Sequence, residues 1–269
     1  MGAGGSTKRS ASIDELTRQL LDLGVVPGGV LLTHTSFSRL RPIVQGPLGV
    51  IAALRAALGP QGTLVMPSFA DDDDQPFVSS RTPCCGVGIV ADTFWRIPGV
   101  ARSDSPHAFA AIGPEAEAIL QPHPVERPHC ADSPVGRVHA LNGQILLLGV
   151  GHDANTTIHL AESLAGVRYR RAKHATVVKN SRPQRIAFAE IDHCCARFAL
   201  MEDWLDAECL QSKSHFGHGE ARLMHANSVV DIALDRLKAD ETVFLHEFGV
   251  DHECDEALAS LSAAKPQAR

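Results

Sequence analysis

A strand-like apolar run at 144–150 leads directly into a glycine turn, a polar loop and a helix-like stretch. That stretch carries His159 and Glu162, three residues apart. A strand that runs into a helix is the building unit of α/β proteins, whose ligands bind at the carboxyl edge of the sheet. The segment therefore predicts either a histidine poised as a general base or a helix that Asn155 or Thr156 merely caps.

Apolar patterns elsewhere predict that strands alternate with helices. The first helix should begin at Ser12, with Glu15 completing a capping box, and end at Gly24. Further strands are expected at 30–33, 63–66 and 242–246, further helices at 47–58, 89–96, 114–120, 134–141, 194–208 and 228–238, and a hairpin at 175–179 and 184–191. This order predicts a three-layer α/β/α sandwich with a mainly parallel central sheet and an inserted hairpin and helical lobe.

The totals exclude several classes of protein. The 269 residues, 44% hydrophobic and 21% charged, suit a single domain over 12–262 with flexible tails at 1–11 and 263–269. A net charge of −6 disfavours nucleic acid as a partner, and no apolar run reaches the roughly 20 residues that span a membrane. Without a signal-peptide core, we expect a cytoplasmic monomer or homodimer. Seven cysteines, an odd number, favour free thiols or a metal site over disulfides.

Polar residues gather where the first two predicted strands end. Thr35 and Ser36 offer hydroxyl groups that suit a carbonyl or a phosphate, although a plain polar turn has the same composition. Four adjacent carboxylates follow the second strand and Phe69, at Asp71, Asp72, Asp73 and Asp74. An acidic loop over a cleft attracts a polycation, although most charge runs are only solvated.

Two later segments are also candidates. A polar cluster around Pro106 could hold a phosphate or form an ordinary turn; it consists of Arg102, Ser103, Asp104, Ser105 and His107. Glu190 and Asp192 lie two residues apart on a predicted strand and therefore on one face. Either could orient His159 or hold an ammonium group, unless Asp192 only caps the next helix. The sequence has no Gly-x-Ser-x-Gly elbow, Walker A loop or Gly-x-Gly-x-x-Gly after a strand.

Several motifs together carry a family resemblance. They are PGGVLLTHTSF at 27–37, GPLG at 46–49, the segment 54–68, SPVGRVH at 133–139, LLLGVGHDANTTIHLAE at 146–162 and DHCC at 192–195. With these motifs, the chain from about residue 13 to 237 resembles the aminoglycoside 3-N-acetyltransferase family, in particular the type IV branch that acts on apramycin, gentamicin and tobramycin.

The resemblance implies transfer of an acetyl group from acetyl-CoA to the 3-amine of a 2-deoxystreptamine antibiotic, by an α/β sandwich distinct from the GCN5-type acetyltransferases. It implies that His159 is catalytic. The aminoglycoside would face Asp71, Asp72, Asp73, Asp74, Phe69, Asn155, Glu190 and Asp192, and CoA would lie near His34, Thr35, Ser36, Arg102, Ser103, Ser105, His107 and Gly151. The chain departs from the family at Ser105, where a histidine often precedes the proline.

The expected mechanism follows from these assignments. His159 takes a proton from the amine and is held in the right tautomer by Glu190 or Asp192, with Glu162 as a more distant candidate. Hydroxyl or backbone N–H groups at Thr35 and Ser36 stabilise the oxyanion.

A second constellation lies near the C-terminus. Cys194, Cys195, His252 and Cys254, with His193 and His246 nearby, could bind a structural zinc ion or could simply be buried side chains. Two other functions stay open. One is a zinc-dependent hydrolase that uses His152, Asp153, His159 and Glu162, and the other is a non-catalytic protein that binds aminoglycosides.

Overall fold

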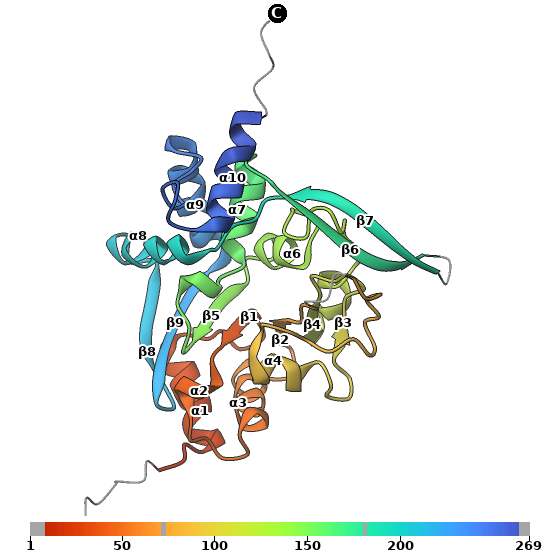
Figure 1. Cartoon of the computed structure of the whole chain (residues 1–269). Helices are drawn as coiled ribbons and strands as arrows, with labels where there is room; N and C mark the ends of the chain where they lie inside the picture. Colours follow the sequence, from red (N-terminus) through yellow and green to blue (C-terminus); the bar gives the residue numbers. More distant parts are fainter. Residues whose placement is uncertain (1–8, 71–73, 180–181, 264–269) are drawn as a thin grey trace, which may run out of the picture.

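Seven strands form one twisted sheet in the computed structural model, which describes residues 9–70, 74–179 and 182–263 (Figure 1). The strand order is β3-β4-β2-β1-β5-β9-β8. The strands are β1 (Val30–Thr35), β2 (Thr63–Pro67), β3 (Ala101–Arg102), β4 (Phe109–Ile112), β5 (Gln144–Leu148), β8 (Gln211–Phe216) and β9 (Gly219–His225). Strand β1 runs parallel to its neighbours β2 and β5, whereas the outer pairs are all antiparallel. The sheet is therefore mixed, and the prediction of a mainly parallel sheet is wrong.

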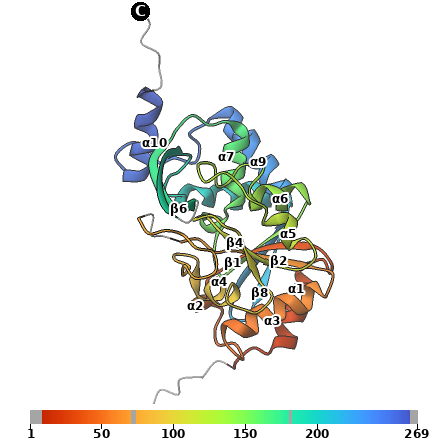
Figure 2. The same cartoon turned by 90° about the vertical axis from the view of Figure 1, so that its right-hand side faces the viewer.

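Helices cover both faces of the sheet (Figures 1 and 2). One face carries α1 (Ile13–Leu23), α2 (Phe37–Leu40), α3 (Pro47–Leu58) and α4 (Gly88–Phe94). The other carries α5 (Ala116–Ile119), α6 (Pro134–Ala140), α7 (Thr157–Ala165), α8 (Met201–Ala207), α9 (Ala226–Ala239) and α10 (His252–Ala263). Alternation in β1 explains the two cores, because Leu31 packs with the first set and Leu32 with the second.

A two-stranded hairpin, β6 (Arg171–Lys179) and β7 (Arg182–Glu190), extends from the second helical layer (Figure 1). It confirms the predicted hairpin. Strand β6 begins at Arg171 instead of at 175, and β7 begins at Arg182 instead of at 184. The segment after β7 then returns to the sheet edge through a short 3₁₀ turn, Ala196–Leu200.

The three parallel strands bring their carboxyl ends to the same edge of the sheet. Gly149 turns the chain directly after β5 with φ of 66°, a left-handed conformation that favours glycine. A Cβ at this position would lie 3.0 Å from the Ser36 carbonyl oxygen, so the turn after β5 packs closely on the end of β1. This close approach places the 152–165 segment beside the end of β1.

Helix ends follow the predicted signals well. Ser12 Oγ accepts a hydrogen bond from Glu15 N at the start of α1, and Gly24 ends that helix in a left-handed conformation. Pro47 opens α3 and Gly59 follows its last residue, also as predicted.

Two expectations about the C-terminal third are wrong, and two strands there were not predicted. The helix predicted at 194–208 begins only after Cys195, whose backbone is left-handed with φ of 60°. The strand predicted at 242–246 is a buried turn that Asp240 stabilises through Thr242. The strands β8 and β9 were not predicted, because β8 is polar and mostly exposed.

The two chain ends are described only in part. Residues 1–8 and 264–269 of the predicted tails lie outside the described residues. Ala11, which the sequence placed in the first tail, is buried and forms a bridge with Ile43. Within the described parts of the chain, no helix has the length and apolar character needed to cross a membrane.

Gly49 in α3 provides a test of the packing between that helix and the preceding loop. A Cβ at this position would lie 2.0 Å from the Val44 carbonyl oxygen and 3.2 Å from Ile43 Cγ2. We expect Gly49→Ala to lower the free energy of unfolding by about 1–3 kcal/mol, although alanine is the better helix former. Chemical denaturation measures the change. As a reference, Ala56→Gly on the exposed side of α3 should cost about 1 kcal/mol from helix propensity alone. A Gly49→Ala variant more stable than the wild type would contradict the packing argument.

Candidate active site

A histidine–glutamate pair on α7 forms the centre of the site. His159 Nδ1 and Glu162 Oε2 are 2.7 Å apart, because residues at i and i+3 share one face of a helix. The Glu162 side chain is completely buried, whereas 12% of the His159 side chain is exposed. Glu162 therefore orients His159 and leaves Nε2 as the nitrogen that faces outward.

Glu162 is held by three donors. Besides His159, the ring of His193 donates from Nε2 to Oε1 at 2.8 Å, and the Tyr169 hydroxyl donates to the same oxygen. Complete burial alone would raise the pKa of Glu162, but the hydrogen bond and positive charge of His159 and the hydrogen bond from His193 lower it to about 2. The carboxylate is thus ionised and stable in a buried position.

This arrangement corrects the predicted orientation of the base. The sequence favoured Glu190 or Asp192 as the partner of His159 and placed Glu162 behind them. The contact between His159 Nδ1 and Glu162 Oε2 shows that Glu162 is the direct partner.

Cys195 lies against the outward nitrogen of His159. Its Sγ is 3.3 Å from His159 Nε2, and its backbone N donates to His193 Nδ1 at 3.1 Å. Together with the two contacts of Glu162, these bonds close a ring that runs from Glu162 through His193 and Cys195 to His159 and back. Because His193 Nδ1 accepts, the network assigns its proton to Nε2.

The electrostatics of His159 reflect two opposing effects. Burial lowers the pKa of the imidazole, but Cys195 and Glu162 outweigh burial, so the pKa lies above the ordinary histidine value. The His129 ring stacks on His159 with centroids 5.0 Å apart and planes 23° apart, and Phe198 contacts its edge. His159 is therefore a basic, tightly positioned side chain.

A cavity of about 750 Å³ opens beside His159 and Cys195 at the carboxyl edge of the sheet. Its wall includes three carboxylates, from Asp153, Glu190 and Asp192, and no lysine or arginine among the described lining residues. Glu190 and Asp192 both line it, but strand alternation is not the reason, because β7 ends at Glu190 and Ile191 lines the cavity as well. The cavity is therefore electronegative.

A second cavity, of about 680 Å³, lies on the other side of His159 between the 124–130 loop and β7. Four residues line both cavities: His129, His159, Glu190 and Ile191. His159 thus stands at a junction that can be reached from two directions.

Three other histidines on the first cavity are neutral near pH 7. Burial lowers the pKa of His34 to about 4, and burial, with the charge of Lys173, does the same for His107. Burial also holds the pKa of His129 well below its ordinary value. These rings therefore add polar and aromatic surface to the wall without adding positive charge.

The two predicted carboxylates differ in their surroundings. Asp192 pairs with Arg171 and with Lys173, whose Nζ lies 2.8 Å from Oδ2. Glu190 is 6% exposed, and its Oε1 lies 3.7 Å from His107 Nε2. The charge of Asp192 is thus largely balanced within the protein.

The acidic loop is only partly described. Asp71, Asp72 and Asp73 lie outside the described residues. Asp74 reaches away to the hairpin, where His174 Nε2 is 2.9 Å and Arg185 Nη1 3.6 Å from its Oδ1. Phe69 lines the first cavity and packs edge-on against His107 and His129.

The end of β1 contributes polar groups to the same cavity. His34, Thr35 and Ser36 all line it. Thr35 Oγ1 is buried without a hydrogen-bond partner among the described residues, whereas Ser36 N already donates to the Leu148 carbonyl oxygen. Thr35 thus keeps an unused hydroxyl group beside the cavity, whereas the Ser36 N–H is already engaged.

At the start of α7, Asn155 both lines the cavity and caps the helix, as one of the two sequence interpretations predicted. Asn155 lines the cavity, yet its Oδ1 accepts from Thr157 N and its Nδ2 lies 3.4 Å from His152 Nδ1. Gly151 lies just before this turn, and its carbonyl accepts from Ala154 N in the 3₁₀ turn.

The predicted phosphate-binding cluster is mostly structural. The guanidinium of Arg102 donates to the carbonyl oxygens of Ser68, Ser79 and Thr82 and stacks on Phe77 and Trp95. Ser103 Oγ accepts from Phe109 N, and Ser105 is buried with no partner for its hydroxyl among the described residues. Of this cluster, His107 lines the first cavity, while Arg102 ties the chain at Ser68 to the chain at Ser79 and Thr82.

The predicted zinc ligands do not form one group. Cys195 contacts His159, and His252 is 82% exposed beside Glu256, so only Cys194 and Cys254 of the four lie together. That predicted set is therefore wrong. The cluster required for a zinc hydrolase does not form either, because the buried His152 ring faces Gln211 and Glu202.

Sequence reasoning missed three residues that shape the site. His193 was considered only as a metal ligand, and neither His129 nor Tyr169 belongs to a motif that would single it out. Tyr169 is the single tyrosine of the chain, and it lies in an arginine-rich segment. Only the fold brings these three side chains to Glu162 and His159.

Comparisons with known proteins point to one enzyme family. The family model described as aminoglycoside 3-N-acetyltransferase matches residues 32–238. Aminoglycoside N(3)-acetyltransferase IV of Salmonella is 54% identical over 234 residues, which cover 86% of this chain and 89% of the relative. Aminoglycoside N(3)-acetyltransferase IX of Micromonospora chalcea is 34% identical over 190 residues, covering 63% of this chain and 66% of that protein.

Solved structures show the same fold. The apoenzyme of aminoglycoside acetyltransferase AAC(3)-IVa superposes with a TM-score of 0.92 at 51% identity, covering 95% of this chain and 99% of that one. A histidine-to-alanine mutant of that enzyme in complex with a gentamicin gives 0.91 at 50% identity over 95% and 99% of the two chains. The same mutant in complex with apramycin gives 0.84 at 50% identity over 88% and 96%. The chain therefore belongs to the aminoglycoside 3-N-acetyltransferase family and is an acetyltransferase of that family.

Proposed function

We propose that this acetyltransferase moves the acetyl group of acetyl-CoA directly to the 3-amine of gentamicin- and apramycin-type aminoglycosides, with His159 as the general base. The observation that carries this proposal is the position of His159 at the junction of two cavities, with Glu162 buried behind it. Two substrates can approach one base from different directions, which favours transfer within a ternary complex. The complexes of AAC(3)-IVa with a gentamicin and with apramycin support the choice of substrates.

The charge of the first cavity suits a polycationic drug. Glu190, Asp192 and Asp153 supply negative charge, and the neutral His34 and His107 do not oppose it. Ammonium groups of the antibiotic would pair with Glu190, whose side chain lines both cavities beside His159.

The reacting amine must lose a proton before it can attack the thioester. His159 Nδ1–H donates to Glu162, which leaves Nε2 to accept that proton. The carboxylate strengthens the base and stabilises the imidazolium that forms. The Cys195 thiol lies on the same nitrogen, so its side chain must rotate away as the amine approaches.

Attack on the acetyl carbonyl places negative charge on its oxygen. Thr35 lines the cavity and its buried hydroxyl has no partner among the described residues, so this hydroxyl is the donor we assign to the oxyanion. The backbone N–H of Ser36 is excluded from this role because it bonds to Leu148.

A second route uses Cys195 as a nucleophile. The order Cys195–His159–Glu162 has the geometry of an acyl-transfer triad, in which a base activates the thiol and a carboxylate orients the base. In the first step, the Cys195 thiolate would attack the acetyl carbonyl and expel CoA thiolate, which takes up the thiol proton through His159. In the second step, the amine would attack the acetylated Cys195 and expel its thiolate, which takes up the amine proton through His159. This route predicts a burst of free CoA and an acetylated protein in the absence of aminoglycoside, and direct transfer predicts neither.

His159 and Cys195 should respond differently to removal. We expect His159→Ala to lower kcat by about 10²–10⁴-fold, since general base catalysis contributes that much, with little change in drug affinity. Cys195→Ala should keep most of the activity if transfer is direct. The assay follows free CoA thiol released from acetyl-CoA with gentamicin or apramycin, and His215→Ala on the exposed β8 is the matched control. Near-normal turnover by His159→Ala would sink the assignment, and drug binding without thiol release by the wild type would indicate a binding protein.

The pH dependence of kcat tests the role of Glu162. A general base must be unprotonated, so kcat should rise with pH through the pKa of His159, which Cys195 and Glu162 raise. Glu162→Gln removes the carboxylate charge, so we expect the acid limb of the profile to move down by about one pH unit or more and the plateau to fall about 10²-fold. Tyr169→Phe keeps the carboxylate and should move the limb much less. An unchanged limb in Glu162→Gln would rule out its proposed influence on the base.

Glu190 tests the electrostatic recognition of the drug. We expect Glu190→Gln to raise KM for aminoglycosides about tenfold, because a hydrogen bond to a charged group is worth roughly 1.5–3 kcal/mol, while KM for acetyl-CoA changes little. Steady-state kinetics with each substrate varied in turn measure both constants. Glu208→Gln removes an equal charge from an exposed position at the end of α8 and serves as the control. Equal effects of the two substitutions would argue against a specific contact.

A further inference from the structure

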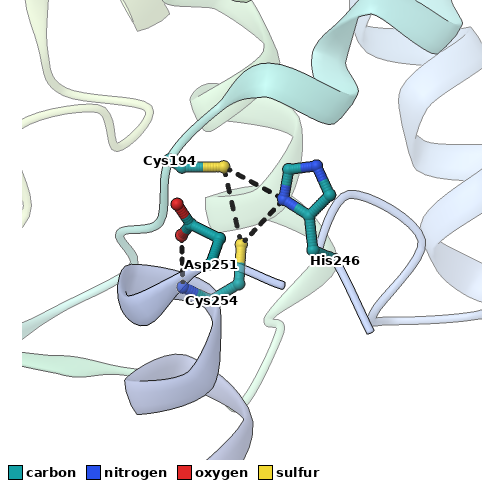
Figure 3. A group of neighbouring side chains, drawn as sticks. All are labelled: Cys194, His246, Asp251 and Cys254. Atoms are coloured by element: carbon teal, nitrogen blue, oxygen red, sulfur yellow. Dashed lines mark hydrogen bonds between the residues drawn. The ribbon is translucent and has the colours of Figure 1, made fainter. Parts of the chain in front are cut away.

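Four metal-binding side chains meet beside the active site. Cys194 Sγ lies 3.3 Å from His246 Nδ1 and 3.6 Å from Cys254 Sγ, and Cys254 Sγ lies 3.6 Å from His246 Nδ1 (Figure 3). A carboxylate oxygen of Asp251 completes a group whose atoms all lie within 4.8 Å of one another. The mechanism of acetyl transfer uses none of these four residues.

The spacing of the ligand atoms matches tetrahedral zinc. With Zn–S bonds of about 2.3 Å and Zn–N bonds of about 2.0–2.1 Å, a tetrahedron places two sulfurs about 3.8 Å apart and a sulfur and a nitrogen about 3.6 Å apart. The three distances among Cys194, Cys254 and His246 differ from these values by a few tenths of an ångström at most.

The chemistry of the group also favours a cation. Thiols are weak hydrogen-bond donors and acceptors, so two thiols around one imidazole nitrogen stabilise one another poorly. Cys254 is completely buried and the other three side chains are half-buried, so the group lies at the edge of the core. Two sulfurs, one imidazole nitrogen and one oxygen in tetrahedral arrangement select zinc over harder cations such as Mg²⁺ or Ca²⁺.

Asp251 caps the start of α10 and also lies beside the two thiols. One of its oxygens, Oδ1, accepts from Cys254 N at 3.0 Å, which fixes the carboxylate at the start of α10. The carboxylate also lies against the thiols of Cys254 and Cys194. A carboxylate held by such a bond is an oriented ligand, as metal sites require.

We propose that Cys194, His246, Asp251 and Cys254 bind a structural zinc ion. The ion joins three separate segments: the loop after β7, the loop after α9 and the start of α10 (Figure 3). Four protein ligands leave no open coordination position, so the site is structural rather than catalytic. The proposal is independent of the substrates assigned above, and it replaces two members of the ligand set expected from sequence, Cys195 and His252, by His246 and Asp251.

Metal analysis of the purified full chain tests the proposal. After dialysis against metal-free buffer, we expect elemental mass spectrometry to find about one zinc ion per chain. Cys254→Ser and His246→Ala should retain less than about a tenth of it, because loss of one of four ligands opens a structural site. His252→Ala and Cys209→Ser change an exposed histidine and an exposed cysteine and should retain zinc fully.

Two measurements on the wild type keep the test independent of how the variants fold. Protein loaded with cobalt should show the thiolate-to-cobalt charge-transfer band and the visible spectrum of a tetrahedral ion. Removal of zinc by a chelator should lower Tm by about 5 °C or more, since the ion binds only the folded chain.

Three results of the metal analysis and one result of intact-mass measurement would overturn the proposal. The metal results are a wild-type protein without stoichiometric metal, zinc retained by both Cys254→Ser and His246→Ala, or zinc lost from His252→Ala. An intact mass lower by two hydrogens, which a disulfide between Cys194 and Cys254 would produce, would also overturn it, because those thiols would not be available to a metal.

Discussion

The active site depends on one buried carboxylate. Complete burial of an ionised glutamate costs several kcal/mol unless its oxygens are fully hydrogen-bonded. Glu162 meets that condition through His159, His193 and Tyr169, which come from α7, the loop after β7 and the segment before β6. Loss of any one donor leaves the others misplaced, so the carboxylate fixes the base and also holds together the segments that surround it.

The sheet explains why these segments meet. Only β2, β1 and β5 are parallel, and their carboxyl ends place the Thr35 turn, Phe69 and the start of α7 at one edge. The antiparallel strands β4 and β9 both begin near that edge, because Phe109 pairs with Pro67 and Ala221 with Leu148. The loop before β4 therefore brings His107 to the cavity, and the hairpin adds Glu190 at the end of β7.

The sequence predicted the parts of this structure that rest on local signals. Capping residues located α1 and α3, apolar runs located β1, β2 and β5, and the motif at 146–162 located His159. Contacts between distant residues could not be predicted in this way. Whether Glu162 or Glu190 orients His159 depends on which carboxylate reaches His159 Nδ1, and only the fold shows this. The structural role of Arg102 depends on three backbone carbonyl oxygens in a loop that has no periodic sequence pattern. Polar edge strands such as β8 carry no apolar pattern, so the sequence did not predict the antiparallel pair β8 and β9 either.

The adjacent cysteines show how tightly the two sites are connected. Cys195 adopts a left-handed backbone that costs a residue other than glycine roughly 1–2 kcal/mol. His193 fixes that turn by accepting from Cys195 N, and as a result Cys194 and Cys195 point to opposite sides. One thiol reaches the group around His246 and the other reaches His159. A metal ion on the first side would restrict the same turn that places the second thiol, so the anchor of α10 and the contact to His159 would both depend on the left-handed turn at Cys195.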